Sequence, residues 1–150
     1  MILYRIAKCI YADDLSGTGA RLYGGRWNSE GKSAVYLASS GSLAVLEVLV
    51  HLPPLLIPND YCLVEIEVPE NSISAIAPEE LPVNWAAISP PLALKQLGDE
   101  FLKKQAYLVL KLPSAIVPKE FNYLINPLHK DMKRVKILQK QHFNFDERLV

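Results

Sequence analysis

The side chains best suited to chemistry lie in two stretches, a glycine-rich segment over residues 17–28 and an apolar run over residues 43–52. The glycine-rich segment holds four of the chain's seven glycines, together with Arg21, Arg26 and two large aromatic residues. Glycine lets a backbone approach a ligand closely, and arginine donates to anions in a planar fork. The segment is therefore suited to holding a planar or anionic group, although a glycine cluster taken alone is more often a pair of turns.

Two nucleotide-binding motifs nearly match the glycine-rich segment, and both fail. The GxGxxG pattern would need glycine at Leu22, and a P-loop ending in Gly31-Lys32-Ser33 would need glycine at Arg26. A P-loop also needs a helix immediately afterwards, so that backbone N–H groups point at the phosphates. Residues 34–38 are instead typical of a strand, so a backbone cradle for phosphates is not expected.

Glu47 and His51 are the strongly polar side chains of the apolar run over residues 43–52, which predicts a buried helix. They are four residues apart and share one face. Carboxylates are rarely buried without a partner, so Glu47 faces either a solvent-exposed stripe or a cleft. A histidine near a helix C-terminus is favoured by the helix dipole. A metal site is not expected, because no third ligand is evident.

The elements that must position these side chains are predicted from hydrophobic periodicity and turn signals. Besides the helix over residues 43–52, a second helix is predicted to start at Ser89-Pro90 and to continue through Phe101. Residues 69–90 hold four prolines and are expected to be irregular. The predicted strands cover residues 2–6, 34–38, 61–68, 107–112 and 135–138, within a total of six or seven. Because strands and helices do not alternate regularly, the pattern indicates a single α+β domain over residues 1–150.

Composition and cysteine usage predict a cytoplasmic protein. Sixteen basic and sixteen acidic side chains give a net charge of zero, which argues against direct nucleic-acid binding. Cys9 and Cys62 are too few for a disulfide framework, and we expect two reduced, mostly buried thiols. No signal peptide or membrane-spanning run is expected. The oligomeric state stays open, a homo-oligomer included.

Ser114, Asn122 and Asn126 are polar residues at the ends of predicted apolar elements. Ser114 follows a proline and has no Gly-x-Ser-x-Gly surroundings, so a turn hydroxyl is favoured over a hydrolase nucleophile. Asn126-Pro127 indicates a turn. The simplest interpretation of Asn122 and Asn126 is local capping of the backbone.

Taken together, these stretches resemble the RES domain family, the toxins of bacterial toxin–antitoxin pairs. The family is named for an arginine, a glutamate and a serine, which correspond here to Arg26, Glu47 and Ser114. The tyrosine of the family's site corresponds to Tyr36. The resemblance runs nearly end to end through Tyr4-Arg5-Ile6, Gly17 to Gly31, Tyr36, Leu46-Glu47, Pro113-Ser114, Asn122 to His129, Phe145-Asp146 and Arg148.

The resemblance implies a fold like that of the diphtheria-toxin class of ADP-ribosyltransferases, with a split, mostly antiparallel sheet and a few helices. It implies NAD as the substrate, without a metal. Those transferases use a His-Tyr-Glu set, whereas an arginine stands first here. Within the RES family, both NAD breakdown by water or phosphate and ADP-ribosylation of a protein are known outcomes. A helix-turn-helix antitoxin of the Xre type that covers the active site is the implied partner.

The implied chemistry is cleavage of the nicotinamide–ribose bond, whose transition state carries positive charge on the ribose ring. A carboxylate fixed nearby stabilises that charge, which is the role expected of Glu47. Tyr36 is expected to stack on nicotinamide, and Arg26 to bind the pyrophosphate. Ser114 is expected to form a hydrogen bond with the nucleotide or to position Glu47.

Three further residues are predicted to support the site, Arg21 beside Arg26, and Asn126 and His129 at the rim. The acceptor, which is water, phosphate or a protein side chain, stays open. A catalytically idle fold that only binds a nucleotide or a partner is the alternative from another functional class.

Overall fold

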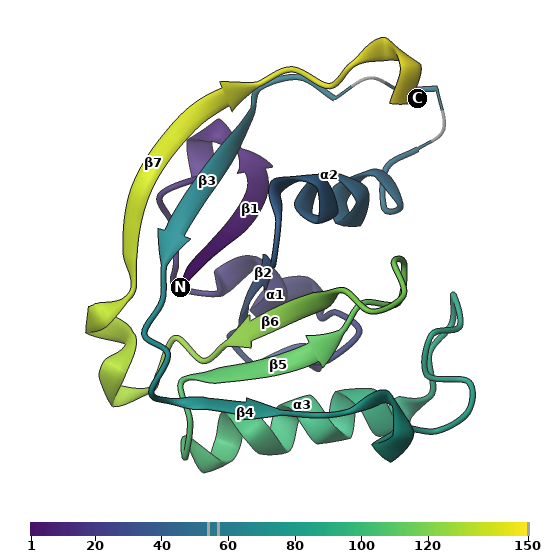
Figure 1. Ribbon diagram of the computed structural model, residues 1–150, viewed down its shortest axis with the longest axis vertical. Helices are drawn as coiled ribbons and strands as arrows, with labels where there is room; N and C mark the ends of the chain where they lie inside the picture. Colours follow the sequence, from purple (N-terminus) through teal and green to yellow (C-terminus); the bar gives the residue numbers. More distant parts are fainter. Residues whose placement is uncertain (54, 57, 150) are drawn as a thin grey trace.

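The structure is a computed structural model that describes residues 1–53, 55–56 and 58–149 (Figure 1). Seven strands form one sheet in the order β4-β5-β6-β2-β1-β3-β7. Every neighbouring pair is antiparallel except β4 and β5. The strands are β1 (Ile2–Lys8), β2 (Val35–Ala38), β3 (Tyr61–Glu67), β4 (Ile73–Ala75), β5 (Val109–Pro113), β6 (Phe121–Ile125) and β7 (Lys136–Phe143).

The sheet is split between β1 and β2. These two strands pair in register only at Tyr4 and Ala38, whereas β1 pairs with β3 along its whole length. One half contains β4, β5, β6 and β2, the other contains β1, β3 and β7, and the two lie at a steep angle to each other (Figure 1). The α+β class and the split, mostly antiparallel sheet predicted from the sequence are confirmed.

The main core fills the angle between the two halves of the sheet. Side chains alternate between the faces of a strand, and one set of alternate positions packs together there. Leu3 on β1 and the alternate β3 residues Val64 and Ile66 meet Val35 and Leu37 of β2 in this cluster, and all five are at most 3% exposed. We call this the inner face of the sheet.

Two helices cover the opposite, outer face. Helix α2 (Gly41–Leu49) begins at Ser40, whose Oγ accepts a hydrogen bond from the backbone N–H of Leu43. Its buried residues pack against Ile6 and Ala38. Helix α3 (Leu92–Lys104) buries Leu94 and Leu102 against strands β5 and β6. Each helix thus builds its own apolar cluster on the same face of the sheet.

The glycine-rich segment contains a short helix, α1 (Thr18–Tyr23), where the glycine cluster indicated turns. Gly17 (φ 78°) precedes it and Gly24 (φ 70°) follows it, both in the left-handed region. Only glycine adopts that region without strain, and Gly24 closes the helix by donating its N–H to the carbonyl of Ala20. The glycines therefore mark the ends of a helix as well as turns.

Two strands were missed from the sequence, and the bounds of others shift. Strand β4 lies in the proline-containing segment expected to be irregular, and it is a three-residue parallel edge strand whose pairing depends on β5. Strand β6 occupies residues that were interpreted only through their asparagines. The predicted helix over residues 43–52 begins two residues earlier and ends at Leu49, so His51 lies in the following turn.

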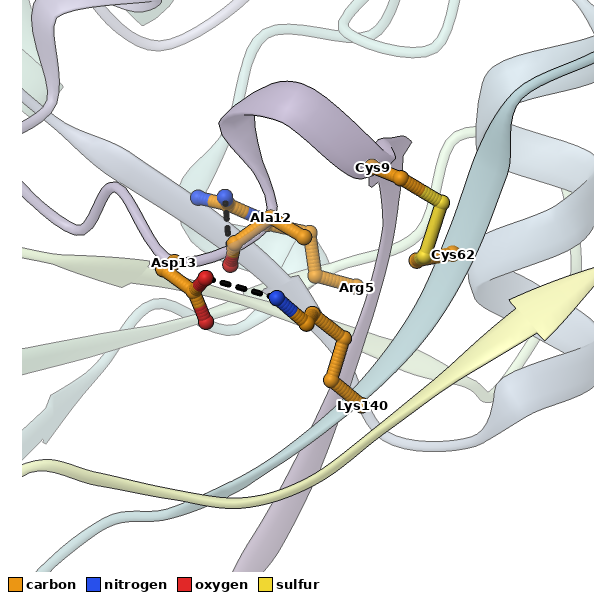
Figure 2. Close-up of a disulfide and its surroundings, with 6 residues drawn as sticks. All are labelled: Arg5, Cys9, Ala12, Asp13, Cys62 and Lys140. Atoms are coloured by element: carbon orange, nitrogen blue, oxygen red, sulfur yellow. Dashed lines mark hydrogen bonds and ion pairs between the residues drawn. A yellow bond between two sulfur atoms is a disulfide. The ribbon is translucent and has the colours of Figure 1, made fainter.

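Cys9 and Cys62 form a disulfide, which corrects the prediction of two reduced thiols (Figure 2). Ala7 of β1 lies opposite Cys62 of β3, and Cys9 begins the turn directly after β1. The chain turns back there and leaves the two Cα atoms 5.0 Å apart, within the range that a disulfide spans. Local sequence patterns did not predict this pairing, because the cysteines are 53 residues apart.

The segment beyond the disulfide is held against the sheet by Arg5 of β1 (Figure 2). The Arg5 guanidinium donates to the backbone carbonyls of Tyr11 (2.8 Å), Ala12 (3.2 Å) and Asp14 (2.9 Å). An ion pair of 2.6 Å between Lys140 and Asp13 joins the same segment to β7. These contacts fix the path that the chain follows from β1 to α1.

We expect removal of the disulfide to lower the free energy of unfolding by about 2–4 kcal/mol, because a cross-link over this loop length restricts the unfolded chain. For a chain of this size that corresponds to a Tm lower by about 5–15 °C. Thermal unfolding of the wild type with and without reductant measures it, and Cys9→Ser should be insensitive to reductant. An equal Tm for oxidised and reduced wild type would show that the disulfide contributes nothing.

Candidate active site

The polar site residues lie between the two apolar clusters on the outer face of the sheet. Tyr36 packs against the cluster of α3, and Ala38, two residues further along β2, belongs to the cluster of α2. Asn122 of β6 lies directly opposite Ala38. Glu47 approaches from α2, and Arg26 comes from the segment that follows α1. The place where the two helical clusters meet is therefore where polar side chains converge.

Glu47 is half-buried on α2 and is held by one hydrogen bond. Its Oε1 accepts from Nδ2 of Asn122 at 2.6 Å. Within the described residues, Oε2 has no hydrogen-bond partner, and it is not among the enclosed polar atoms that lack one. The carboxylate is thus oriented at one oxygen and open at the other. Both options left by the sequence, a solvent-facing stripe and a cleft, are compatible with this geometry.

Arg26 is anchored at one nitrogen and free at the others. Its Nη1 donates to the carbonyls of Trp85 and Ala87, both at 2.9 Å, in the irregular segment before α3. Across the described chain, Nη2 and Nε have no protein partner and are not enclosed. Burial lowers the pKa of the Arg26 guanidinium, and the nearby charge of Glu47 opposes that shift. Arginine still stays protonated, so a fixed cation with free donors lies near Glu47.

Asn28 organises the segment that carries Arg26, a role that was not predicted from the sequence. Its side chain is fully buried, and Nδ2 donates to the carbonyls of Ala20, Ser29 and Lys32. Asparagine commonly bonds nearby backbone in turns. An asparagine two residues after Arg26, at the end of the glycine-rich segment, was the signal available in the sequence.

Tyr36 connects this segment to the sheet. Its hydroxyl donates to Oδ1 of Asn28 at 2.6 Å and accepts from the backbone N–H of Trp27 at 3.1 Å. Burial is the main cause that raises the pKa of Tyr36 above its usual value, which keeps the hydroxyl protonated as a donor. The structure therefore gives Tyr36 a contact through its hydroxyl, while stacking of its ring on nicotinamide stays a prediction.

We expect Tyr36→Phe to lower the free energy of unfolding by about 1–3 kcal/mol, because Oδ1 of buried Asn28 loses its donor. The pH dependence gives a second readout. A raised folded-state pKa stabilises the protein below the ordinary tyrosine pKa of about 10, and this contribution is lost as the pH rises above it. Denaturant unfolding between pH 7 and pH 11 should show a smaller alkaline loss for Tyr36→Phe than for the wild type. Equal stability at every pH would contradict the contact.

Ser114 lies just beyond β5, opposite Glu120 and diagonal to Asn122 on the outer face. It is 5% exposed. Its Oγ accepts from the backbone N–H groups of Ile116 and Val117, each at 3.1 Å. Ser114 is thus a turn hydroxyl, as the simplest interpretation held, and its own O–H remains free to donate near the site.

Asn126 and His129 are not brought to Glu47. Asn126 lies one residue beyond β6, roughly 13 Å along the strand from Asn122, and is 1% exposed. It donates to the carbonyl of Leu102 at 2.9 Å and accepts from Leu128 N–H at 3.1 Å. His129 is also buried, and its Nδ1 accepts from the N–H of Asp131 at 3.0 Å. Both side chains hold the loop after β6, which does not support their predicted places at the rim.

Arg21 and His51 are exposed at the surface. Arg21 is part of α1, and the described residues offer its guanidinium no hydrogen bond, so its predicted help to Arg26 stays a prediction. No group of three or more metal-binding side chains occurs in the described ranges. No helix among the described residues is long and apolar enough to cross a membrane.

The RES resemblance predicted a split, mostly antiparallel sheet with Arg26, Tyr36 and Glu47 at its site, and the structure has such a sheet. The RES domain family matches residues 2–146. The chain therefore belongs to the RES domain family, and this prediction is confirmed.

Relatives of this chain are similar over nearly their whole length. A protein of Photorhabdus laumondii named "Toxin Res" is 43% identical, with 100% of this chain and 97% of the relative covered. A protein of a Sphingobium strain named "Prs ADP-ribosylating toxin" is 42% identical, with 96% and 91% covered. The fold resembles that of a chain in the crystal structure of the M. tuberculosis MbcT-MbcA toxin-antitoxin complex, with a TM-score of 0.75, 19% identity, and 95% of this chain and 84% of that chain covered.

Proposed function

We propose that this protein is a bacterial toxin that cleaves the nicotinamide–ribose bond of NAD, depletes NAD and arrests growth. The observation that carries the proposal is the Glu47 carboxylate, held at one oxygen and open at the other, with the free donors of Arg26 nearby. Relatives named as toxins support the biological setting.

In the proposed reaction the bond between ribose C1′ and the nicotinamide nitrogen breaks. Nicotinamide takes the bonding electron pair and leaves as a neutral molecule, so it needs no strong acid. Positive charge develops on the ribose ring, and the open oxygen of Glu47 stabilises it at close range. The unshared donors of Arg26 suit the pyrophosphate oxygens, and the free O–H of Ser114 suits a nucleotide oxygen.

The acceptor completes the reaction at C1′. Water gives ADP-ribose and releases a proton, whereas phosphate gives an ADP-ribose phosphate, as in a glycohydrolase or a phosphorylase. A protein side chain gives an ADP-ribosylated protein. The relative named as an ADP-ribosylating toxin favours keeping transfer to a protein as the second candidate.

Product analysis tests the proposal. The purified protein is incubated at catalytic amounts with NAD, with and without phosphate and cell lysate, and free nicotinamide and ribosyl products are measured. Many nicotinamide molecules per protein without lysate support NAD breakdown. A discrete labelled protein band from labelled NAD, without bulk NAD loss, supports the transferase. If no product forms under any of these conditions, the alternative of a catalytically idle, binding-only fold is supported.

A helix-turn-helix antitoxin of the Xre type that covers the site is the partner we propose, with the cytoplasm as the place of action. The similar fold in a toxin-antitoxin complex is consistent with this partner. Expression of the chain alone should arrest growth, and co-expression of a helix-turn-helix antitoxin that binds it should restore growth. Arrest that persists despite a bound candidate would contradict a covered active site.

A further inference from the structure

We infer that Asn122 is a positioning residue that holds Oε1 of Glu47, so that Oε2 faces the substrate. The sequence favoured a local backbone cap at Asn122, whereas its side chain reaches across to Glu47 on α2, 75 residues away in sequence. This inference rests on the proposed function, because it assigns a role to Asn122 within the same site.

Asn122 occupies one of the most constrained positions in the sheet. It is paired with Ala38 of β2 on one side and with Leu112 of β5 on the other, so its backbone is bonded within the half-sheet. A glutamate side chain has several rotatable bonds and loses conformational freedom only when it is tethered. The Nδ2–Oε1 contact of 2.6 Å therefore transfers the fixed geometry of β6 to a flexible carboxylate on a separate helix.

The neutrality of this donor preserves the negative charge that the reaction requires. No ion pair forms between Glu47 and Arg26 in the described part of the chain, and Nη1 of Arg26 donates to two backbone carbonyls. Asn122 is the one hydrogen-bond partner of Glu47 among the described residues. An amide orients a carboxylate without cancelling its charge, whereas a salt bridge would reduce the field at the ribose ring.

A double-mutant cycle separates this role from a structural one. We expect Asn122→Ala to lower kcat for nicotinamide release by about 10- to 100-fold, the range for losing one hydrogen bond to a charged group. KM should change little, because the contact does not reach the substrate. In a Glu47→Asp background the carboxylate is too short to reach Asn122, so Asn122→Ala should lower kcat by less than about 3-fold. A structural role would instead give multiplicative effects.

Two further measurements guard against trivial explanations. Asn144→Ala, at an exposed asparagine outside the site, should retain wild-type kcat. In NMR spectra of the free protein, the Asn122 side-chain amide proton should shift upfield in Glu47→Ala, whereas the Asn71 side-chain amide should not. An unchanged Asn122 resonance, or multiplicative effects in an active protein, would overturn this role alone. A wild type that releases no nicotinamide would overturn the proposed function and this role with it.

Discussion

Glu47→Gln is expected to lower nicotinamide release by about 10²- to 10³-fold, the effect of removing one preorganised electrostatic contact from a transition state. Glutamine keeps the size of the side chain and still offers an oxygen to the amide of Asn122. The fold and the hydrogen bond are therefore retained, while the negative charge at the ribose ring is lost. The measurement is the initial rate of nicotinamide release with saturating NAD, together with growth after induced expression.

The matched control is Glu67→Gln, the same substitution at an exposed position of β3. It should release nicotinamide at the wild-type rate and arrest growth equally well. Far-UV circular dichroism and Tm should be similar for both variants and the wild type. If folded Glu47→Gln consumes NAD and arrests growth as fast as the wild type, Glu47 does not carry the role assigned here.

Among glycine-to-alanine substitutions in the helices, Gly98→Ala is expected to lower the free energy of unfolding the most. A Cβ built on Gly98 would overlap the backbone carbonyl oxygen of Trp27, so α3 and the Arg26-bearing segment have to move apart. Overpacking of this kind usually costs about 1–3 kcal/mol, occasionally more. The displaced segment is also tied to α3 through Asp99, which accepts from the N–H of Ser29 at 2.9 Å. Nicotinamide release should therefore fall together with Tm.

Gly19→Ala is the matched control, because Gly19 is also helical and has no neighbouring atom within 4 Å of the position that an added methyl group would take. Alanine is favoured over glycine in a helix by about 0.5–1 kcal/mol, so this variant should be as stable as the wild type or slightly more stable. Urea unfolding of both variants measures the difference. If Gly98→Ala matched Gly19→Ala in stability, close packing of α3 on Trp27 would be wrong.

The hydrogen-bond partners of the asparagine side chains are a part of the candidate site that the sequence could not predict. Local capping was the interpretation of Asn122 and Asn126, since asparagine forms hydrogen bonds to nearby backbone in many turns. In the structure Asn126 accepts from nearby Leu128 but also donates to distant Leu102. Asn28 accepts a hydrogen bond from the hydroxyl of Tyr36, and Asn122 donates to a distant carboxylate. The hydrogen-bond partner of a short side-chain amide depends on which elements lie next to it, and the local sequence does not show which elements these are.

The sequence alone was enough to predict the α+β class, the helix that carries Glu47 and the membership of the RES family. These depend on local periodicity and on ordered motifs, which a single chain displays directly. Three contacts became visible in the folded chain alone: the Cys9–Cys62 disulfide, the anchoring of Arg26 by the carbonyls of Trp85 and Ala87, and the pairing of Glu47 with Asn122. Each of these joins residues that are 53 or more positions apart, and such contacts follow from strand order and register, which periodicity does not encode.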